Sequence, residues 1–150
     1  MQETRTEIQF SVFLVNKPGV LAQVTGALAK SKVNVVAMTL VDSQEHGVLR
    51  LVAEDAKSAR EVLAKLNLPM TETEVLRLEL SNRPGALADV ATLLGENHIN
   101  INYAYCTSGA AGGHTTGIFK VADPKKAEKV LKVGGGKHKE ANIRRLGERR

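Results

Sequence analysis

An internal repeat limits what this chain can fold into more than any other feature of its sequence. Residues 16–24 read NKPGVLAQV, and residues 82–90, which lie 66 positions later, read NRPGALADV. The tripeptide VNV at residues 33–35 recurs as INI at the same offset, and DAKSA at residues 55–59 recurs as DPKKA at an offset of 68. Three segments that keep register predict two copies of one unit of about 65 to 70 residues.

Each copy has the hydrophobic pattern of the same five elements. Apolar runs rich in β-branched residues predict strands, and the spacing of Leu21, Val24 and Leu28, which recurs in the second copy, predicts an amphipathic helix. The order is strand, helix, strand, strand, helix, in a domain over residues 1–73 and again in a domain over residues 74–150. The expected strands are residues 8–15, 33–41 and 47–53, then 75–80, 99–105 and 116–121, and the expected second helices are residues 56–66 and 124–131.

A fourth strand is needed to complete each unit. In the first copy, residues 70–74 can supply it before the chain enters the strand that begins at Val75. In the second copy the signal is poor, because only Ala141 and Ile143 alternate within a basic segment, so we expect a weak strand or a flexible end there. The fold class that follows is α+β, a sheet with helices on one face.

The sequence Asn-x-Pro-Gly stands where the first strand meets the first helix in each copy. Proline cannot donate to a strand ladder and glycine allows positive φ, so the motif ends the strand. The turn directs the free N–H groups of the helix outward beside the positive end of its dipole, where a carboxylate fits. Asn16 and Asn82 add a donor and an acceptor. The alternative is a good turn without a ligand, which the recurrence at the same junction makes less attractive.

A second asparagine follows each loop asparagine by 18 residues. Asn34 and Asn100 each lie between β-branched residues at the start of the second strand, where asparagine has low strand propensity. A binding role and a cap between helix and strand both explain such a residue.

These residues resemble the ACT domain, a small regulatory module. Residues 82–90 and 98–101 are especially similar to the serine-sensing ACT domain of phosphoglycerate dehydrogenase, and the resemblance covers residues 7 to about 131 in two consecutive copies. It implies tandem ferredoxin-like βαββαβ units with antiparallel sheets, which pair side by side and bind a free amino acid in the seam. It also implies that the loop of one domain holds the ligand and the second-strand asparagine of the neighbouring domain closes the site. The ligand-binding residues carried over in this way are Asn16, Pro18, Gly19, Val20, Leu21, Asn34, Asn82, Pro84, Gly85, Ala86, Leu87 and Asn100.

One position departs from the serine-sensing pattern. That domain has a histidine two residues before the loop asparagine, where this chain has Leu14 and Leu80. The change suggests a more apolar pocket, unless the two leucines are simply core residues. Tandem units can pair within one chain or between chains, and exposed strand edges favour a homodimer.

Composition and spacing predict no catalytic residue, no metal and no cofactor. The four histidines lack metal-ligand spacing, and no glycine-rich phosphate loop occurs. No run of about 18 apolar residues could cross a membrane. The polar N-terminus is unlike a secretory signal, and the single cysteine, Cys106, excludes an intrachain disulfide, so we expect a cytoplasmic protein.

The net charge of +5 lies mainly in the tail, residues 137–150, which carries six basic and two acidic side chains. A charged tail is usually a solvated end, so nucleic-acid binding is unlikely. We expect a non-catalytic protein that senses an amino acid and regulates a partner enzyme. The alternative is an interaction subunit of an amino-acid biosynthetic enzyme, without a ligand of its own. The sequence does not identify the amino acid. It also leaves open whether both sites work, because Lys17 and Gln23 of the first loop are replaced by Arg83 and Asp89 in the second.

Overall fold

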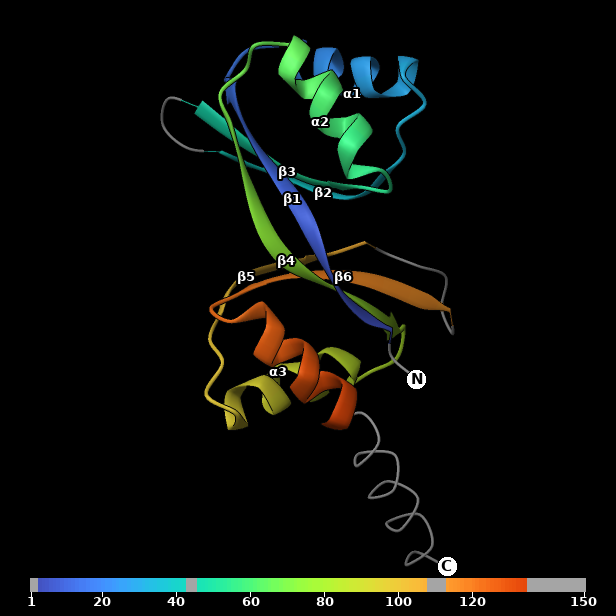
Figure 1. Cartoon of the computed structure of the whole chain (residues 1–150), viewed down its shortest axis with the longest axis vertical. Helices are drawn as coiled ribbons and strands as arrows, with labels where there is room; N and C mark the ends of the chain where they lie inside the picture. Colours follow the sequence, from blue (N-terminus) through green and yellow to red (C-terminus); the bar gives the residue numbers. More distant parts are fainter. Residues whose placement is uncertain (1–2, 43–45, 108–112, 135–150) are drawn as a thin grey trace, which may run out of the picture. The chain divides into compact units, whose positions relative to one another are not determined.

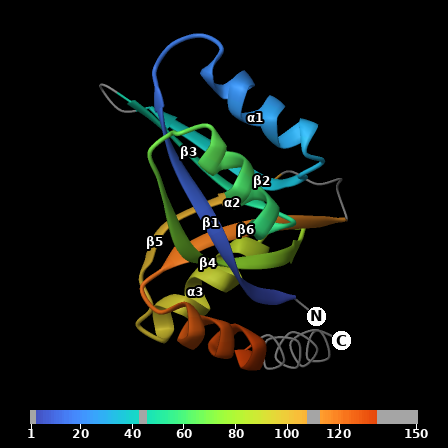
Figure 2. The ribbon, with the colours of Figure 1, turned by 45° about the horizontal axis from the view of Figure 1, so that its top comes forward.

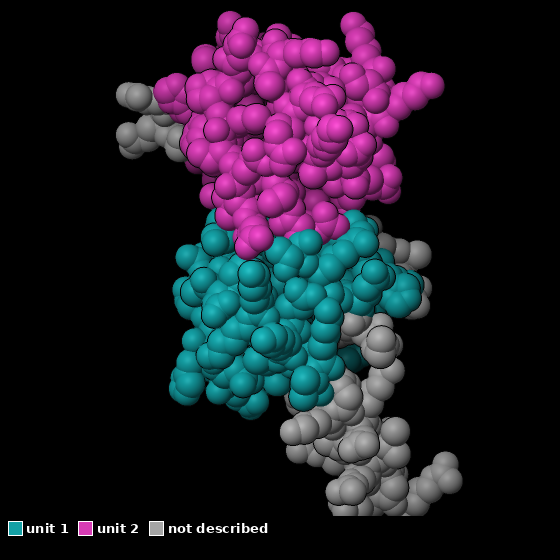
Figure 3. Space-filling model, in the orientation of Figure 1, with its two compact units in different colours: residues 1–6, 75–150 teal, residues 7–74 magenta. Residues whose placement is uncertain are grey.

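The chain forms two compact units in the computed structural model, which describes residues 3–42, 46–107 and 113–134. Unit 1 comprises residues 1–6 and 75–150, and unit 2 comprises residues 7–74 (Figure 3). This division differs from domains over residues 1–73 and 74–150, because the first six residues group with the second copy of the repeat.

Unit 2 holds the first copy of the repeat and completes a βαββαβ order by itself. Its strand order is β2-β3-β1-β4, and α1 and α2 cover one face of the sheet (Figures 1 and 2). The backbone N–H of Phe13 donates to the carbonyl of Pro69 at 2.9 Å, beside the start of β4. Residues 70–74 therefore supply the fourth strand, as the sequence predicted. The elements are β1 (Thr4–Val15), α1 (Val20–Lys30), β2 (Val35–Asp42), β3 (His46–Ala53), α2 (Ala56–Lys65) and β4 (Met70–Ser81), of which β1 and β4 each run through both units.

The core of unit 2 fixes the end of β1. Alternate β1 residues, Phe10, Val12 and Leu14, are buried against Leu28 of α1 and Leu63 of α2. Burying one large apolar side chain contributes about 1.5 to 3 kcal/mol. The loop that follows Val15 is therefore positioned by a strand whose alternate side chains are fixed in the core.

Unit 1 holds the second copy, in the strand order β1-β4-β6-β5. It contains α3 (Ala86–Glu96), β5 (Ile101–Cys106), β6 (His114–Val121) and a fourth helix, described over residues 124–134, which carries no label in Figure 1. Its core repeats that of unit 2, and its buried members include Leu76, Leu78 and Leu80 of β4, Leu94 of α3, Phe119 of β6 and Leu131 of the fourth helix. The expected α+β class with two ferredoxin-like units is confirmed.

The first residues of the chain supply the fourth strand of unit 1. The backbone N–H of Glu79 donates to the carbonyl of Glu3 at 3.0 Å. The hydroxyl of Thr6 donates to Glu128 of the fourth helix at 3.1 Å. The strand or flexible end that we expected around residues 141–146 lies outside the described residues. The beginning of β1 covers the edge of β4 that would otherwise be unpaired.

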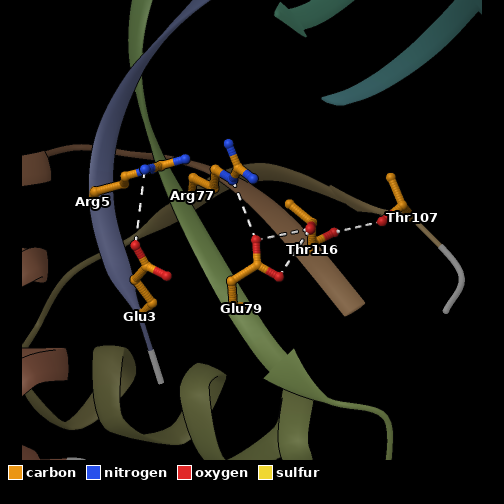
Figure 4. A network of polar contacts seen from close by, with 6 residues as sticks. All are labelled: Glu3, Arg5, Arg77, Glu79, Thr107 and Thr116. Carbon is orange, nitrogen blue, oxygen red and sulfur yellow. Dashed lines mark hydrogen bonds and ion pairs between the residues drawn. The ribbon is translucent and has the colours of Figure 1, made fainter. Parts of the chain in front are cut away.

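Polar side chains line the face of the unit 1 sheet that lies away from its helices. Arg77 and Glu79 alternate with the buried leucines of β4, so they project to the opposite face. The hydroxyl of Thr116 donates to the Glu79 carboxylate at 2.9 and 3.1 Å, and Arg77 Nε donates to it at 3.3 Å (Figure 4). These bonds satisfy a partly buried carboxylate within unit 1.

Candidate functional site

The loop that joins β1 to α1 leaves the start of α1 open. Gly19 has φ +91°, a left-handed conformation that glycine adopts without steric cost, and α1 begins at the next residue. The helix has no side-chain cap and no acidic residue in its first turn. Its first N–H groups have no partner within the helix, so they and the dipole favour an anion at this end.

A pocket of about 210 Å³ lies beside this loop within unit 2. This is smaller than the roughly 300 to 1,000 Å³ of sites for drug-sized ligands, and it suits a small molecule. The loop, the start of α1, the end of β2 and the start of β3 all contribute to its lining, which comprises Leu14, Val15, Asn16, Lys17, Val20, Leu21, Leu40, Val41, Asp42 and Gly47.

Asp42 is a pocket residue that the sequence analysis missed. The Asn16 side-chain Nδ2 donates to Asp42 Oδ1 at 3.4 Å. The two residues meet because β1 and β2 both end at the edge where Gly47 of β3 pairs with Leu14 and with Asp42. The signal was present in the sequence as an acidic residue directly after an expected strand, but its value depends on knowing that register.

The loop that joins β4 to α3 in unit 1 has the same backbone. Gly85 has φ +87°, close to Gly19, and α3 also lacks a side-chain cap. The N–H of Arg83 donates to Ser81 O, as the N–H of Lys17 donates to Val15 O, in both cases at 2.9 Å. The positive φ expected of the glycine in Asn-x-Pro-Gly is therefore found in both copies.

Side chains make the second loop different from the first. The Arg83 guanidinium donates to the carbonyl of Pro84 at 3.1 Å and forms an ion pair with Asp89 at 2.9 Å. Asp89 lies in the first turn of α3, so a carboxylate of the protein itself already stands at this helix end. The backbone N–H of Asn82 donates to the carbonyl of Gly113 at 2.9 Å.

The second-strand asparagines lie away from the loops within each unit. Asn34 directly precedes β2 and Asn100 directly precedes β5, and both are exposed. The carbonyl of Asn34 accepts from the N–H of Glu54, and the carbonyl of Asn100 accepts from that of Ala122. Asn34 is therefore at the opposite end of β2 from Asp42, and no unit by itself brings its two predicted asparagines together.

Leu14 and Leu80, the residues at the histidine position, are both buried in the core of their units. Leu14 also lines the pocket, so its two interpretations are compatible.

Other chemistry finds little support in the described part of the chain. Within it, histidine, cysteine and acidic side chains form no cluster of three that would suit a metal ion. Partial burial raises the pKa of the Cys106 thiol, which disfavours the nucleophilic thiolate. None of the helices in the described ranges has the length and apolar character needed to cross a membrane. The basic tail lies outside the described residues.

Comparison with protein families gives a match over almost the whole chain. A family model described as an ACT domain pair matches residues 5–140. The chain belongs to this family. A search of curated proteins found no match.

Solved structures share the fold of this ACT domain pair. Protein BT0572 from Bacteroides thetaiotaomicron is 29% identical with a TM-score of 0.80, and the match covers 88% of this chain and 90% of that one. The ligand-free regulatory subunit of aspartate kinase from Thermus thermophilus is 14% identical with a TM-score of 0.65, covering 87% and 93%. Escherichia coli aspartokinase III in complex with lysine and aspartate is 19% identical with a TM-score of 0.54, covering 87% of this chain and 31% of that one.

Proposed function

We propose that this ACT domain pair is a non-catalytic regulatory protein that binds a free amino acid at its Asn-x-Pro-Gly loop and modulates a partner enzyme. One observation carries the proposal: a small pocket opens between the uncapped start of α1 and the side chains of Asn16 and Asp42. A helix N-terminus offers N–H groups to a carboxylate, and an amide beside a carboxylate offers acceptors to an ammonium group.

The structural relatives support the regulatory part of the proposal. One is a regulatory subunit of aspartate kinase, and an aspartokinase of the same fold was solved with lysine and aspartate. Binding of a ligand changes a partner only through a difference in affinity between two states, so the partner must contact the pair differently when the pocket is filled.

The full site would include a neighbouring domain. Asn34 and Asn100 are exposed and distant from the loop of their own unit, so a role for them requires the seam between paired domains. Within the described ranges, β2 and β5 each have one neighbour in the strand order, and an exposed strand edge favours pairing in a homodimer.

Thermal unfolding of the full chain with each of the twenty amino acids at millimolar concentration tests the proposal. A ligand at 100 times its Kd adds about 2.7 kcal/mol, which raises the midpoint of a chain of this size by roughly 5 to 10 °C. We expect a shift with one amino acid or a few similar ones, and its loss in Asn16→Ala. Glu61→Ala, which changes an exposed side chain of α2 away from the loop and from the strand edges, is the control.

The absence of any shift in a folded sample would contradict amino-acid sensing. It would favour the second candidate, an interaction subunit of an amino-acid biosynthetic enzyme, which the likeness to a regulatory subunit supports. Co-purification with a larger catalytic chain would then be the decisive observation.

A further inference from the structure

Among the described residues, the charged side chains that line the unit 2 pocket are one cation and one anion. Lys17 belongs to the loop before α1, and Asp42 ends β2. The start of α1 adds partial positive charge on the side of the loop. An α-amino acid carries one negative and one positive charge at neutral pH, so its carboxylate matches Lys17 and α1 while its ammonium matches Asp42.

The Asn16–Asp42 contact leaves this carboxylate able to accept a ligand. At 3.4 Å the bond is near the long limit for hydrogen bonds, and it engages one of roughly four acceptor positions. A charge-assisted bond from an ammonium is shorter and about twice as strong as a neutral one. The same contact turns the Asn16 amide so that its nitrogen faces Asp42, which frees its oxygen to accept from the ligand.

Aliphatic side chains form the rest of the wall. Val15, Leu40 and Val41 are 54%, 48% and 43% exposed, although residues of this kind are usually buried. They gather around the pocket with the buried Leu14 and Val20. Gly47 faces the same space, where an added Cβ would lie 3.6 Å from Leu40 Cδ1. A ligand with an aliphatic side chain would remove this apolar surface from water, which is favourable.

Unit 1 does not repeat this chemistry at its own loop. Thr115 occupies the position of Gly47, because it pairs with Leu80 as Gly47 pairs with Leu14. Cys106 occupies the position of Leu40, at the corresponding place beside β6. The apolar wall is therefore replaced by more polar residues. In sequence, Ser108 takes the position of Asp42, and it lies outside the described residues.

We infer that the unit 2 pocket selects a zwitterionic amino acid with an aliphatic side chain, and that Asp42 is the specificity residue that holds its ammonium group. The inference rests on the proposed function and names its ligand class and its working loop. It predicts that valine, leucine and isoleucine bind in preference to charged amino acids.

Isothermal titration calorimetry of the full chain with L-leucine as the probe tests this assignment. We expect L-leucine to bind at least about tenfold more tightly than L-aspartate or 4-methylpentanoate, which is leucine without its amino group. Asp42→Asn keeps the shape and removes the charge, so we expect it to weaken leucine at least about tenfold and not to weaken 4-methylpentanoate, whose carboxylate loses a repulsive neighbour. Glu96→Gln, which neutralises an exposed carboxylate at the end of α3, should change neither.

The outcomes separate the two proposals. Leucine binding that survives Asp42→Asn, or tight binding of a charged amino acid instead, would overturn the inference and leave amino-acid sensing intact. No binding of any of the twenty amino acids would overturn both. If Asp42→Asn proves unfolded by circular dichroism, calorimetry of the unchanged protein with 4-methylpentanoate and leucinamide replaces the variant. Equal affinity for leucine and 4-methylpentanoate contradicts an ammonium contact.

Discussion

The two Asn-x-Pro-Gly loops have one backbone and two different surroundings. Gly19 and Gly85 have φ angles of +91° and +87°, and both helices begin at the next residue without a side-chain cap. In unit 1, however, Arg83 and Asp89 form an ion pair across the turn, whereas unit 2 has Lys17 and Gln23 at these positions. The motif therefore specifies the turn, whereas the residues around it decide whether a carboxylate of the protein stands at the start of the helix.

The largest expected effect tests whether the two units are equally well packed. Leu28 of α1 and Leu94 of α3 occupy corresponding buried positions, so replacing either by alanine should lower the free energy of unfolding by about 2 to 5 kcal/mol. Urea titration followed by circular dichroism measures both. A loss below 1 kcal/mol for only one variant would show that the cores are not equivalent.

A smaller effect tests whether the two turns are equivalent. Gly19→Ala and Gly85→Ala each place a Cβ in the left-handed region, which costs roughly 1 to 2 kcal/mol. Nothing lies within 4 Å of the added Cβ at Gly19, and Arg83 Nη1 at 3.6 Å is ordinary contact at Gly85. Thermal unfolding should therefore give similar losses, and a markedly larger one at Gly85 would mean that the ion pair restrains that loop.

Exchange of side chains between the loops tests what makes them differ. Lys17→Arg with Gln23→Asp copies the ion pair of unit 1 into unit 2 and brings a carboxylate to the start of α1. We expect amino-acid affinity to fall about tenfold, since the ligand carboxylate then meets a like charge. The reciprocal pair, Arg83→Lys with Asp89→Gln, removes an exposed ion pair and should change the free energy of unfolding by less than about 1 kcal/mol. Isothermal titration calorimetry measures the amino-acid affinity of the first variant, and urea unfolding measures the stability of the reciprocal one. If the first variant binds the amino acid as tightly as the unchanged protein, a carboxylate at this position does not exclude the ligand.

The smallest expected effect concerns α2, whose start is capped by the side chain of Asp55. The hydroxyl and backbone N–H of Ser58 donate to Asp55 and hold the pKa of this carboxyl below its ordinary value. A pKa lowered by folding stabilises the protein above the unfolded value of about 3.9, and the contribution disappears as pH falls through the folded value. Asp55→Ala should therefore lower the melting temperature at pH 7, and the difference should shrink below pH 3.9. A difference that does not depend on pH would contradict a charged cap.

The sequence predicted the repeat, the order of elements and both turns, because these depend on local patterns. It ended the second strand of unit 2 at Val41, one residue before Asp42. The proximity of Asp42 to Asn16 could not be predicted from the sequence, because it depends on the pairing of β1, β2 and β3. The Arg83–Asp89 ion pair was missed for a different reason. Its residues were noted as differences between the loops, but whether two exposed side chains six positions apart meet depends on the turn between them.

The fourth strand of unit 1 shows the limit more clearly. The weak alternation of Ala141 and Ile143 allowed a weak strand or a flexible end, and that prediction lies outside the described residues. The partner found for Glu79 is Glu3, which is 76 positions upstream, and no local pattern reports a pairing of that range. The roles of Asn34 and Asn100 stay predictions, because a single unit leaves both side chains exposed.

That pairing has a consequence for the order in which the protein matures. A ribosome releases the N-terminus first, and domains generally fold as soon as their parts have emerged. Unit 2 has all its residues once position 74 has been synthesised, but residues 3–6 must wait for β4 before they find their neighbour. Residues 3–6 are thus made before β4 but are placed only after it, so the two halves of β1 reach their final pairing at different times.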